Sequence, residues 1–106
     1  HTEGNNMKQT YQMFFGLNTP QGTISQDAWD AFQDVISMSF AGYTVQDCQG
    51  AWKGSQESTK LVTVTTKYED KVKDVCTAYI DTFNQDAVGL LVSAPMRFVT
   101  KPSEVY

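Results

Sequence analysis

Residues 69–83 read EDKVKDVCTAYIDTF and give the clearest structural signal in the chain. Their apolar side chains recur at the three- and four-residue spacing that gathers them on one side of an α-helix. Two acidic residues open the segment, where negative charge is favourable beside the positive end of the helix dipole. We therefore predict an amphipathic helix over residues 69–83. Its apolar stripe consists of Val72, Val75, Cys76, Tyr79, Ile80 and Phe83.

Strands are predicted on both sides of this helix. Residues 57–66 are rich in β-branched side chains, and residues 85–93 end in an apolar run. Pro95 ends the second strand, and residues 96–99 are expected to form a short extension at the sheet edge. Residues 43–52 are a further strand, joined to the one at 57–66 by a hairpin turn over 53–56. Gly50 within that strand predicts a bulge, or a close approach by another backbone or a ligand.

The first third of the chain adds a strand and a second helix. Residues 8–15 alternate in the manner of a strand, and residues 16–22 have the composition of a turn. Ser25 is a good helix N-cap, and apolar residues follow it at helical spacing, so we predict a helix over 25–38. The apolar positions of this helix are Ala28, Trp29, Phe32, Val35 and Ile36.

The predicted order is strand, helix, strand, strand, helix, strand. Right-handed crossovers then place both helices on one face of an antiparallel sheet. We predict an α+β fold, a ferredoxin-like β-α-β-β-α-β sandwich, as a single domain over residues 7–106. Residues 1–6 are expected to be a remnant of protein expression that precedes Met7. The strands carry apolar residues on both faces, so we predict that other copies of the chain cover the second face. The simpler alternative is a monomer with a scattered apolar surface.

Composition argues against several classes of function. The net charge is −4 and the eight basic residues do not cluster, which disfavours nucleic acids and anionic membranes as partners but would suit a small cationic ligand. The apolar runs are too short to span a bilayer, and no apolar signal region opens the chain, so we expect a cytoplasmic protein. Cys48 and Cys76 are expected to be buried free thiols. The only histidine, His1, lies in the expected remnant, so a metal site is not predicted.

The hairpin segment 50–60, GAWKGSQESTK, is the most informative for function. It places Trp52 and Glu57 on either side of a turn. An aromatic face beside a carboxylate suits a desolvated cation such as a sulfonium. The simpler alternative is a surface tryptophan and a solvated glutamate. No P-loop, GxSxG or HExxH motif is present, so acid–base chemistry would fall to Glu, Asp, Tyr or Lys.

Two family resemblances rest on these and other motifs. The chain resembles a family of uncharacterised bacterial ferredoxin-like domains, and it also resembles, more locally, the phage-encoded S-adenosylmethionine lyases, once described as hydrolases. The second resemblance rests on Gly50, Trp52, Glu57 and residues 85–88, with Trp52 standing where the lyase pattern has a tyrosine. The first rests on residues 15–17, 22, 24–25, 29, 32, 42–45, 50–52, 57, 60–62, 79, 83, 85 and 88.

The lyase resemblance implies a cofactor-free reaction in which the substrate carboxylate attacks its own γ-carbon. Methylthioadenosine leaves and homoserine lactone forms, and the main task of the protein is to hold the methionine arm in a curled, reactive conformation. It further implies a homotrimer with active sites between subunits, in a bacterial host cell whose restriction the phage counters. Glu57 would be the principal polar catalytic residue, either facing the sulfonium or anchoring the substrate. The aromatic residues around the adenine or the sulfonium of the substrate would be Trp52, Tyr43 and Tyr11. Its ribose or adenine would be bound by Gln85 and Asp86.

Other interpretations remain open at this point. The alternative for Tyr11 and Tyr43 is that they are structural residues of the sheet without a role in binding. The alternative for Asp86 is that it only begins a strand. A non-enzymatic, PII-like nucleotide-sensing trimer is the rival function, and it would require a long loop between the second and third strands. An uncharacterised domain with a different small ligand is a third.

Overall fold

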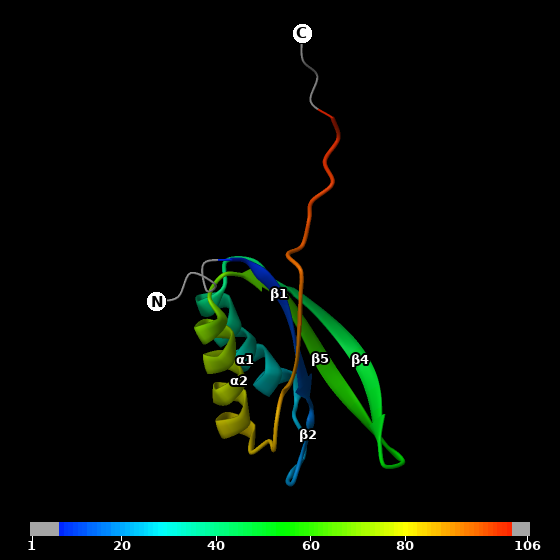
Figure 1. The fold of residues 1–106 in the computed structure, drawn as a ribbon. Coiled ribbons are helices and arrows are strands. Elements are labelled where there is room, and N and C mark those ends of the chain that lie inside the picture. The colour runs from blue at the N-terminus through cyan, green and yellow to red at the C-terminus, as the bar shows by residue number, and fades with distance from the viewer. Residues whose placement is uncertain (1–6, 103–106) are drawn as a thin grey trace.

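The computed structural model describes residues 7–102, apart from the side chain of Trp52. It contains a four-stranded sheet, two helices and a small additional hairpin (Figure 1). The hairpin occupies the segment predicted as a turn. The elements are β1 (Gln9–Gly16), β2 (Asn18–Thr19), β3 (Gly22–Thr23), α1 (Gln26–Ser39), β4 (Thr44–Trp52), β5 (Ser55–Thr66), α2 (Glu69–Phe83) and β6 (Gly89–Ser93).

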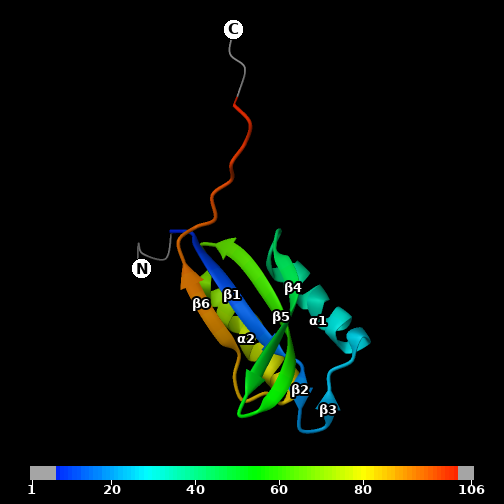
Figure 2. The same ribbon diagram turned by 90° about the vertical axis from the view of Figure 1, so that its right-hand side faces the viewer.

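The four long strands form an antiparallel sheet in the order β4-β5-β1-β6. Both helices lie on one face of this sheet (Figure 1), and Figure 2 looks onto the other face, with α2 behind the strands. This arrangement confirms the predicted α+β fold with the ferredoxin-like order of elements. Within residues 7–102, no helix or strand covers the other broad face of the sheet.

The core forms between the helices and alternate residues of the strands. Tyr11 pairs with Val64 and Met13 pairs with Val62, so these four side chains share the face that the helices cover. All four are almost fully buried. Of the apolar helix residues that the spacing predicted, six are buried: Trp29, Phe32, Ile36, Val72, Val75 and Tyr79. Val35 is exposed, and the others are half-buried.

The helix boundaries follow from identifiable capping contacts. The backbone N–H of Ala28 donates to the Ser25 hydroxyl at 3.1 Å, which confirms Ser25 as the N-cap of α1. Helix α2 has the predicted bounds and ends at Asn84, whose φ of 52° and ψ of 50° place it in the left-handed region. Asparagine tolerates that conformation better than most residues.

Several predicted details of the strands are wrong. The chain does not enter β6 until Gly89, because residues 85–88 cross from the end of α2 to the sheet. Gly50 forms no bulge, since it pairs with Glu57 in an unbroken register. Residues 96–99 leave the sheet instead of extending its edge. The hairpin loop is only Lys53-Gly54, and both residues have the positive φ of a tight two-residue turn, so β5 begins at Ser55.

The uncovered face is less apolar than predicted. Phe14 and Leu61 pair directly there, and Leu91 lies on the neighbouring strand, opposite Gln12. Threonine and glutamine occupy much of the rest, and the Thr10 and Thr65 hydroxyls are hydrogen bonded at 2.9 Å. The face therefore combines a small apolar patch with a polar surround. Both cysteines are free as predicted, but they are half-buried rather than buried.

Candidate functional site

Glu57 lies on the uncovered face of the sheet, near the hairpin that joins β4 and β5. It shares this face with Leu61, because residues two and four apart on a strand point the same way. Its partner on β4 is Gly50, which has no side chain to cover it. The carboxylate is half-buried. Glu57, which the sequence singled out, is thus held at a surface rather than in the core.

The carboxylate of Glu57 reaches across to β1 and lies against Gly16. A Cβ atom added at Gly16 would stand 2.5 Å from Oε2 of Glu57, closer than any real contact allows. The backbone N–H of Asn18 donates to the same oxygen at 3.3 Å. The absence of a side chain at Gly16 therefore creates the space that the carboxylate occupies, and a backbone donor helps to orient it.

Two further side chains fix the backbone on which Glu57 rests. From the helix side, the Tyr79 hydroxyl donates to the carbonyl oxygen of Gly16 at 2.6 Å. From the crossing after α2, the Gln85 amide donates to the carbonyl oxygen of Asn18 at 2.8 Å. Residues 16–18 are consequently held from several directions. Burial, and then the negative charge of Glu57, raise the pKa of Tyr79, which keeps the phenol a hydrogen-bond donor.

Glu57 is the single acidic or basic residue that the four strands place on the uncovered face. The register puts polar, small and apolar residues at the other positions, with the Cys48 thiol the one other titratable group. A charge in such surroundings interacts strongly with a ligand if water is excluded by a covering layer. The strand positions on this face are 10, 12, 14 and 16 on β1, even numbers 44–52 on β4, odd numbers 55–65 on β5, and 89, 91 and 93 on β6.

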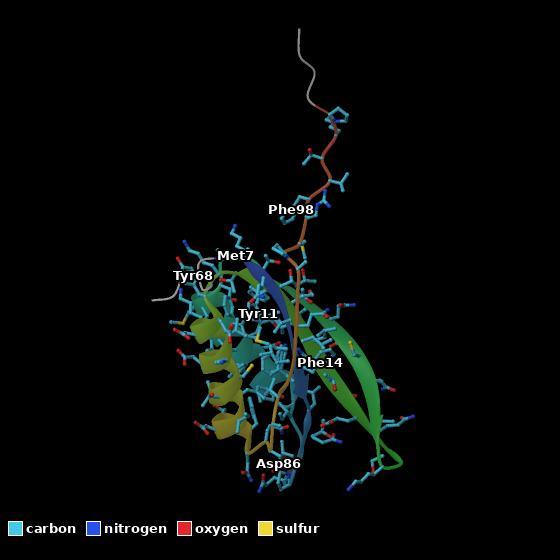
Figure 3. All side chains as sticks on the ribbon, in the orientation of Figure 1. Met7, Tyr11, Phe14, Tyr68, Asp86 and Phe98 are labelled. Atoms are coloured by element: carbon cyan, nitrogen blue, oxygen red, sulfur yellow. The ribbon has the colours of Figure 1, made fainter. Side chains whose placement is uncertain are left out.

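The structure does not bring Tyr11 or Tyr43 to Glu57 within one chain. Tyr11 is 2% exposed on the helix-covered face, and its hydroxyl donates to Gln9 at 3.0 Å and Glu69 at 3.3 Å. Figure 3 shows Tyr11 between sheet and helices, and Phe14 on the other side of the sheet. Tyr43 precedes β4 at the end far from the hairpin, and its hydroxyl lies 2.5 Å from the Ser37 hydroxyl. Their assignment to substrate stays a prediction.

The remaining predicted site residues lie near the hairpin end. The side-chain amide of Gln85 donates to the carbonyl oxygen of Asn18. Gln85 therefore helps to hold residues 16–18, against which the Glu57 carboxylate lies. Asp86 is exposed and lies at the end of the molecule that also carries β2 (Figure 3). Trp52 ends β4 and pairs with Ser55, and its side chain is outside the part that the structure describes.

Three residues of this region were missed as site residues from the sequence. Phe14 was recognised only as an apolar strand residue, yet it shares the face of Glu57, two positions from Gly16. Gly16 was assigned to a turn. Tyr79 was assigned to an apolar stripe and to the first family resemblance, but not to the site. The alternation of residues 8–15 contained the signal for Phe14, whereas the contacts of Gly16 and Tyr79 join residues 63 positions apart.

A pocket of about 320 Å³ is lined by Leu17, by residues 47–49 of β4 and by residues 58–60 of β5. Among these residues, Asp47 and Lys60 belong to the helix-facing side of the sheet. Lys60 contributes the buried charge of this pocket, and its Nζ lies 2.5 Å from Oδ1 of the exposed Asp47. Within residues 7–102, no three His, Cys, Asp or Glu side chains are grouped as ligands for a metal ion. None of the helices in this range has the length and apolar character needed to cross a membrane.

Comparison with known proteins gives one family assignment. No curated protein matches the sequence. Residues 10–98 match the model of a family described as "Protein of unknown function (DUF3574)". The match runs from the start of β1 past the end of β6, and so includes Gly16, Glu57, Tyr79 and Gln85. The chain therefore belongs to the DUF3574 family.

Proposed function

We propose that the protein is an S-adenosylmethionine lyase that cleaves its substrate to methylthioadenosine and homoserine lactone. The observation that carries the proposal is the isolated carboxylate of Glu57 on an uncovered sheet face, fixed over Gly16 beside an apolar patch. This arrangement favours a small organic cation, as the sequence resemblance does. The protein would act in the cytoplasm of a bacterial host cell and deprive host restriction of S-adenosylmethionine.

The proposed reaction needs positioning more than acid–base chemistry. A carboxylate oxygen of the substrate forms a bond to its γ-carbon while the bond from that carbon to sulfur breaks. The electron pair of the broken bond stays on sulfur, which becomes the neutral thioether of methylthioadenosine. No proton moves and no water is consumed. Holding the methionine arm in a curled conformation with reacting atoms close together is therefore the main task of the protein.

The charge changes of this reaction indicate which group Glu57 would bind. The sulfonium and the attacking carboxylate lose their charges in the reaction, but the substrate ammonium keeps its charge throughout. A carboxylate that stabilised the sulfonium would favour the ground state over the transition state. Glu57 is better used as an anchor for the ammonium, where it orients the arm without opposing the loss of charge.

A covering layer over the sheet would assist the same reaction. The reaction neutralises the positive sulfonium and the negative carboxylate of the substrate. Water stabilises this charged ground state more than the partly neutralised transition state, so the activation barrier is lower where water is excluded. Phe14 is half-buried and Leu91 is 56% exposed, so a single chain leaves these two apolar residues of the uncovered face partly in contact with solvent. The proposal therefore includes a homo-oligomer, with the substrate held between subunits, and a trimer is what the resemblance to the lyases implies.

The rival, PII-like sensor has less support. It expects a long loop between the second and third strands of the sheet. The corresponding connection here, between β4 and β5, is the two-residue turn Lys53-Gly54. Such a turn is too short to fold over a bound nucleotide, so we do not propose this function.

Incubation of the purified protein with S-adenosylmethionine, followed by chromatography of methylthioadenosine, tests the proposal. We expect turnover by the wild type and a loss of about 10- to 100-fold in kcat/KM for Glu57→Gln, the effect of removing one charge-assisted contact. Asp74→Asn is the matched control, because Asp74 is an exposed carboxylate on α2 and the same charge is removed.

The possible outcomes distinguish the function from the site. Absence of methylthioadenosine at enzyme concentrations equal to that of the substrate would exclude the lyase. Turnover that Glu57→Gln leaves intact would retain the function but move the site elsewhere. Homoserine in place of its lactone at early times would show that water, not the substrate carboxylate, is the nucleophile.

A further inference from the structure

The residues after β6 form an extended arm that leaves the body of the protein. We define the C-terminal arm as residues 94–102, which have no helix or strand structure. In Figure 1 it runs from the orange end of β6 beyond the edge of the sheet, and Figure 2 shows the same course from a second direction. The radius of gyration is 16.2 Å, against about 13 Å for a compact domain of this length.

The C-terminal arm carries large apolar side chains that its own chain leaves exposed. Val99 is 99% exposed, Phe98 is 80% exposed and Met96 is 45% exposed. Single exposed apolar residues are common, but three within four residues on a projecting segment are typical of a surface that packs against something else. The family match ends at Phe98, so residues 94–98 of the arm lie within it and Val99 lies just beyond it.

A groove lies between the C-terminal arm and the sheet. Its volume is about 510 Å³, and Met96 and Phe98 line one side of it. Thr63 and Thr65, which belong to the uncovered face, line another side. The arm and the sheet of a single chain thus do not close on each other, and both present surface to a further molecule.

The charge of the C-terminal arm is opposite to that of the rest of the chain. Up to residue 102 its charged residues are Arg97 and Lys101, and Glu104 follows in the sequence. Residues 94–106 together carry a net charge of +1, which leaves −5 for the rest of the chain out of the total of −4. The arm is therefore attracted to the body of another copy, and a second copy is a partner of suitable charge.

We propose that the C-terminal arm of one chain packs on the uncovered sheet face of a second copy of the same chain. The more accessible apolar residues of that face are Phe14 and Leu91. They would be covered by the apolar side chains of the arm, Met96, Phe98 and Val99. An arm of nine residues spans up to about 30 Å in extended form, enough to cross a four-stranded sheet. The arm then supplies the covering layer that the chain does not build for its own sheet.

Substitutions on the arm and on the sheet test this proposal through the mass in solution, independently of any enzymatic activity. Light scattering should give the wild type a mass that is a multiple of the 11.9 kDa chain. The double substitution Phe98→Asp with Val99→Asp should reduce it to that of one chain. Thr100→Asp adds charge to the same exposed segment and should retain the assembled mass.

A second pair of variants identifies the surface that receives the arm. Leu91 and Val92 are adjacent on β6 and similarly exposed, at 56% and 48%, but they belong to opposite faces of the sheet. Leu91→Asp should reduce the mass to that of one chain, and Val92→Asp should not. Circular dichroism of each variant checks that the helices are retained.

Three results would overturn the proposal. The first is a wild type with the mass of one chain at every concentration studied, which would leave the arm free or folded on its own sheet. The second is an assembled mass that the arm substitutions do not change. The third is an assembled mass that Leu91→Asp leaves intact, which would place the arm on some other surface.

Discussion

Gly16 and Glu57 form the central contact of the candidate site at the scale of single residues. The carboxylate fills the space that a side chain at position 16 would occupy. Because the carboxylate is the far end of a flexible side chain, it can rotate away without disturbing the sheet. The position of the carboxylate is therefore more sensitive to substitution at Gly16 than the stability of the fold.

Gly16→Ala should separate these two properties. We expect the free energy of unfolding to change by less than about 1 kcal/mol, since the strand tolerates alanine and the carboxylate can move. The displaced carboxylate should lower methylthioadenosine formation at least about tenfold, equivalent to a lost contact of about 1.4 kcal/mol. Urea unfolding and the chromatographic assay measure the two effects.

Gly42→Ala is the control for this substitution. An added Cβ at Gly42 meets no atom within 4 Å, so we expect both stability and activity to be retained. A large loss of stability in Gly16→Ala, or full activity with unchanged stability, would contradict the assigned role of the glycine.

Cys76 gives a pH dependence at the residue scale. Burial raises the pKa of this thiol from 9.0 to about 11. The unfolded chain therefore loses the proton first, and the thiol favours the unfolded state progressively as the pH rises from 9 to 11. We expect the free energy of unfolding to fall over this range, and to fall less steeply in Cys76→Ala.

Tyr11 and Tyr79 explain why some alkaline destabilisation should persist in that variant. Burial raises the pKa of both phenols above 10.0, so they act in the same direction at higher pH. Urea titrations at pH 7, 9 and 11 separate the contributions. Equal slopes for the wild type and Cys76→Ala would show that the thiol does not contribute.

At the scale of elements, strands β4 and β5 are joined by an ion pair on the helix-facing side. The Lys60 side chain is 10% exposed, while that of its partner Asp47 is 82% exposed. The ammonium group also lies over the Trp29 ring, 5.9 Å from the ring centroid. A buried charge of this kind depends on its partner more than it contributes by itself.

Asp47→Ala should destabilise the protein by about 1–3 kcal/mol, because it leaves the buried ammonium with a weaker set of acceptors. Lys60→Met should be nearly neutral, because it removes the charge and keeps a long side chain over Trp29. Urea unfolding of both variants and of the double variant measures the coupling. A neutral Asp47→Ala would contradict this view of the pair.

The sequence was sufficient to predict the elements whose own pattern decides their structure. Helix α2 has the predicted bounds because its apolar stripe is continuous and two acidic residues open its first turn. Residues 85–88 and 96–99 were predicted as strand because their composition is suitable. Neither segment pairs, since pairing depends on where the chain crosses after Asn84 and on where it leaves the sheet after Ser93.

The candidate site could be predicted only in part, for a related reason. The local hairpin indicated Glu57 as a candidate, and the family resemblance singled it out over the alternative of a solvated glutamate. Its contact with Gly16 depends on the pairing of β1 with β5, and the support from Tyr79 depends on how α2 packs. Such contacts arise from the register and packing of distant segments, which local patterns do not specify.

At the scale of the whole molecule, the uncovered sheet face and the C-terminal arm have complementary properties. No helix or strand of the described part of the chain covers the face, and the arm projects apolar side chains from a body of opposite charge. If one covers the other between chains, the site around Glu57 is complete only in the assembled protein. Folding of the single chain and completion of the site are then separate steps.

The most direct test of this account is the specific activity measured over a dilution series, with the mass determined at the same concentrations. We predict that methylthioadenosine formed per chain falls as the mass declines to that of one chain, because dilution uncovers the sheet and exposes Glu57 to water. Activity per chain that stays constant after the protein has become monomeric would contradict the account.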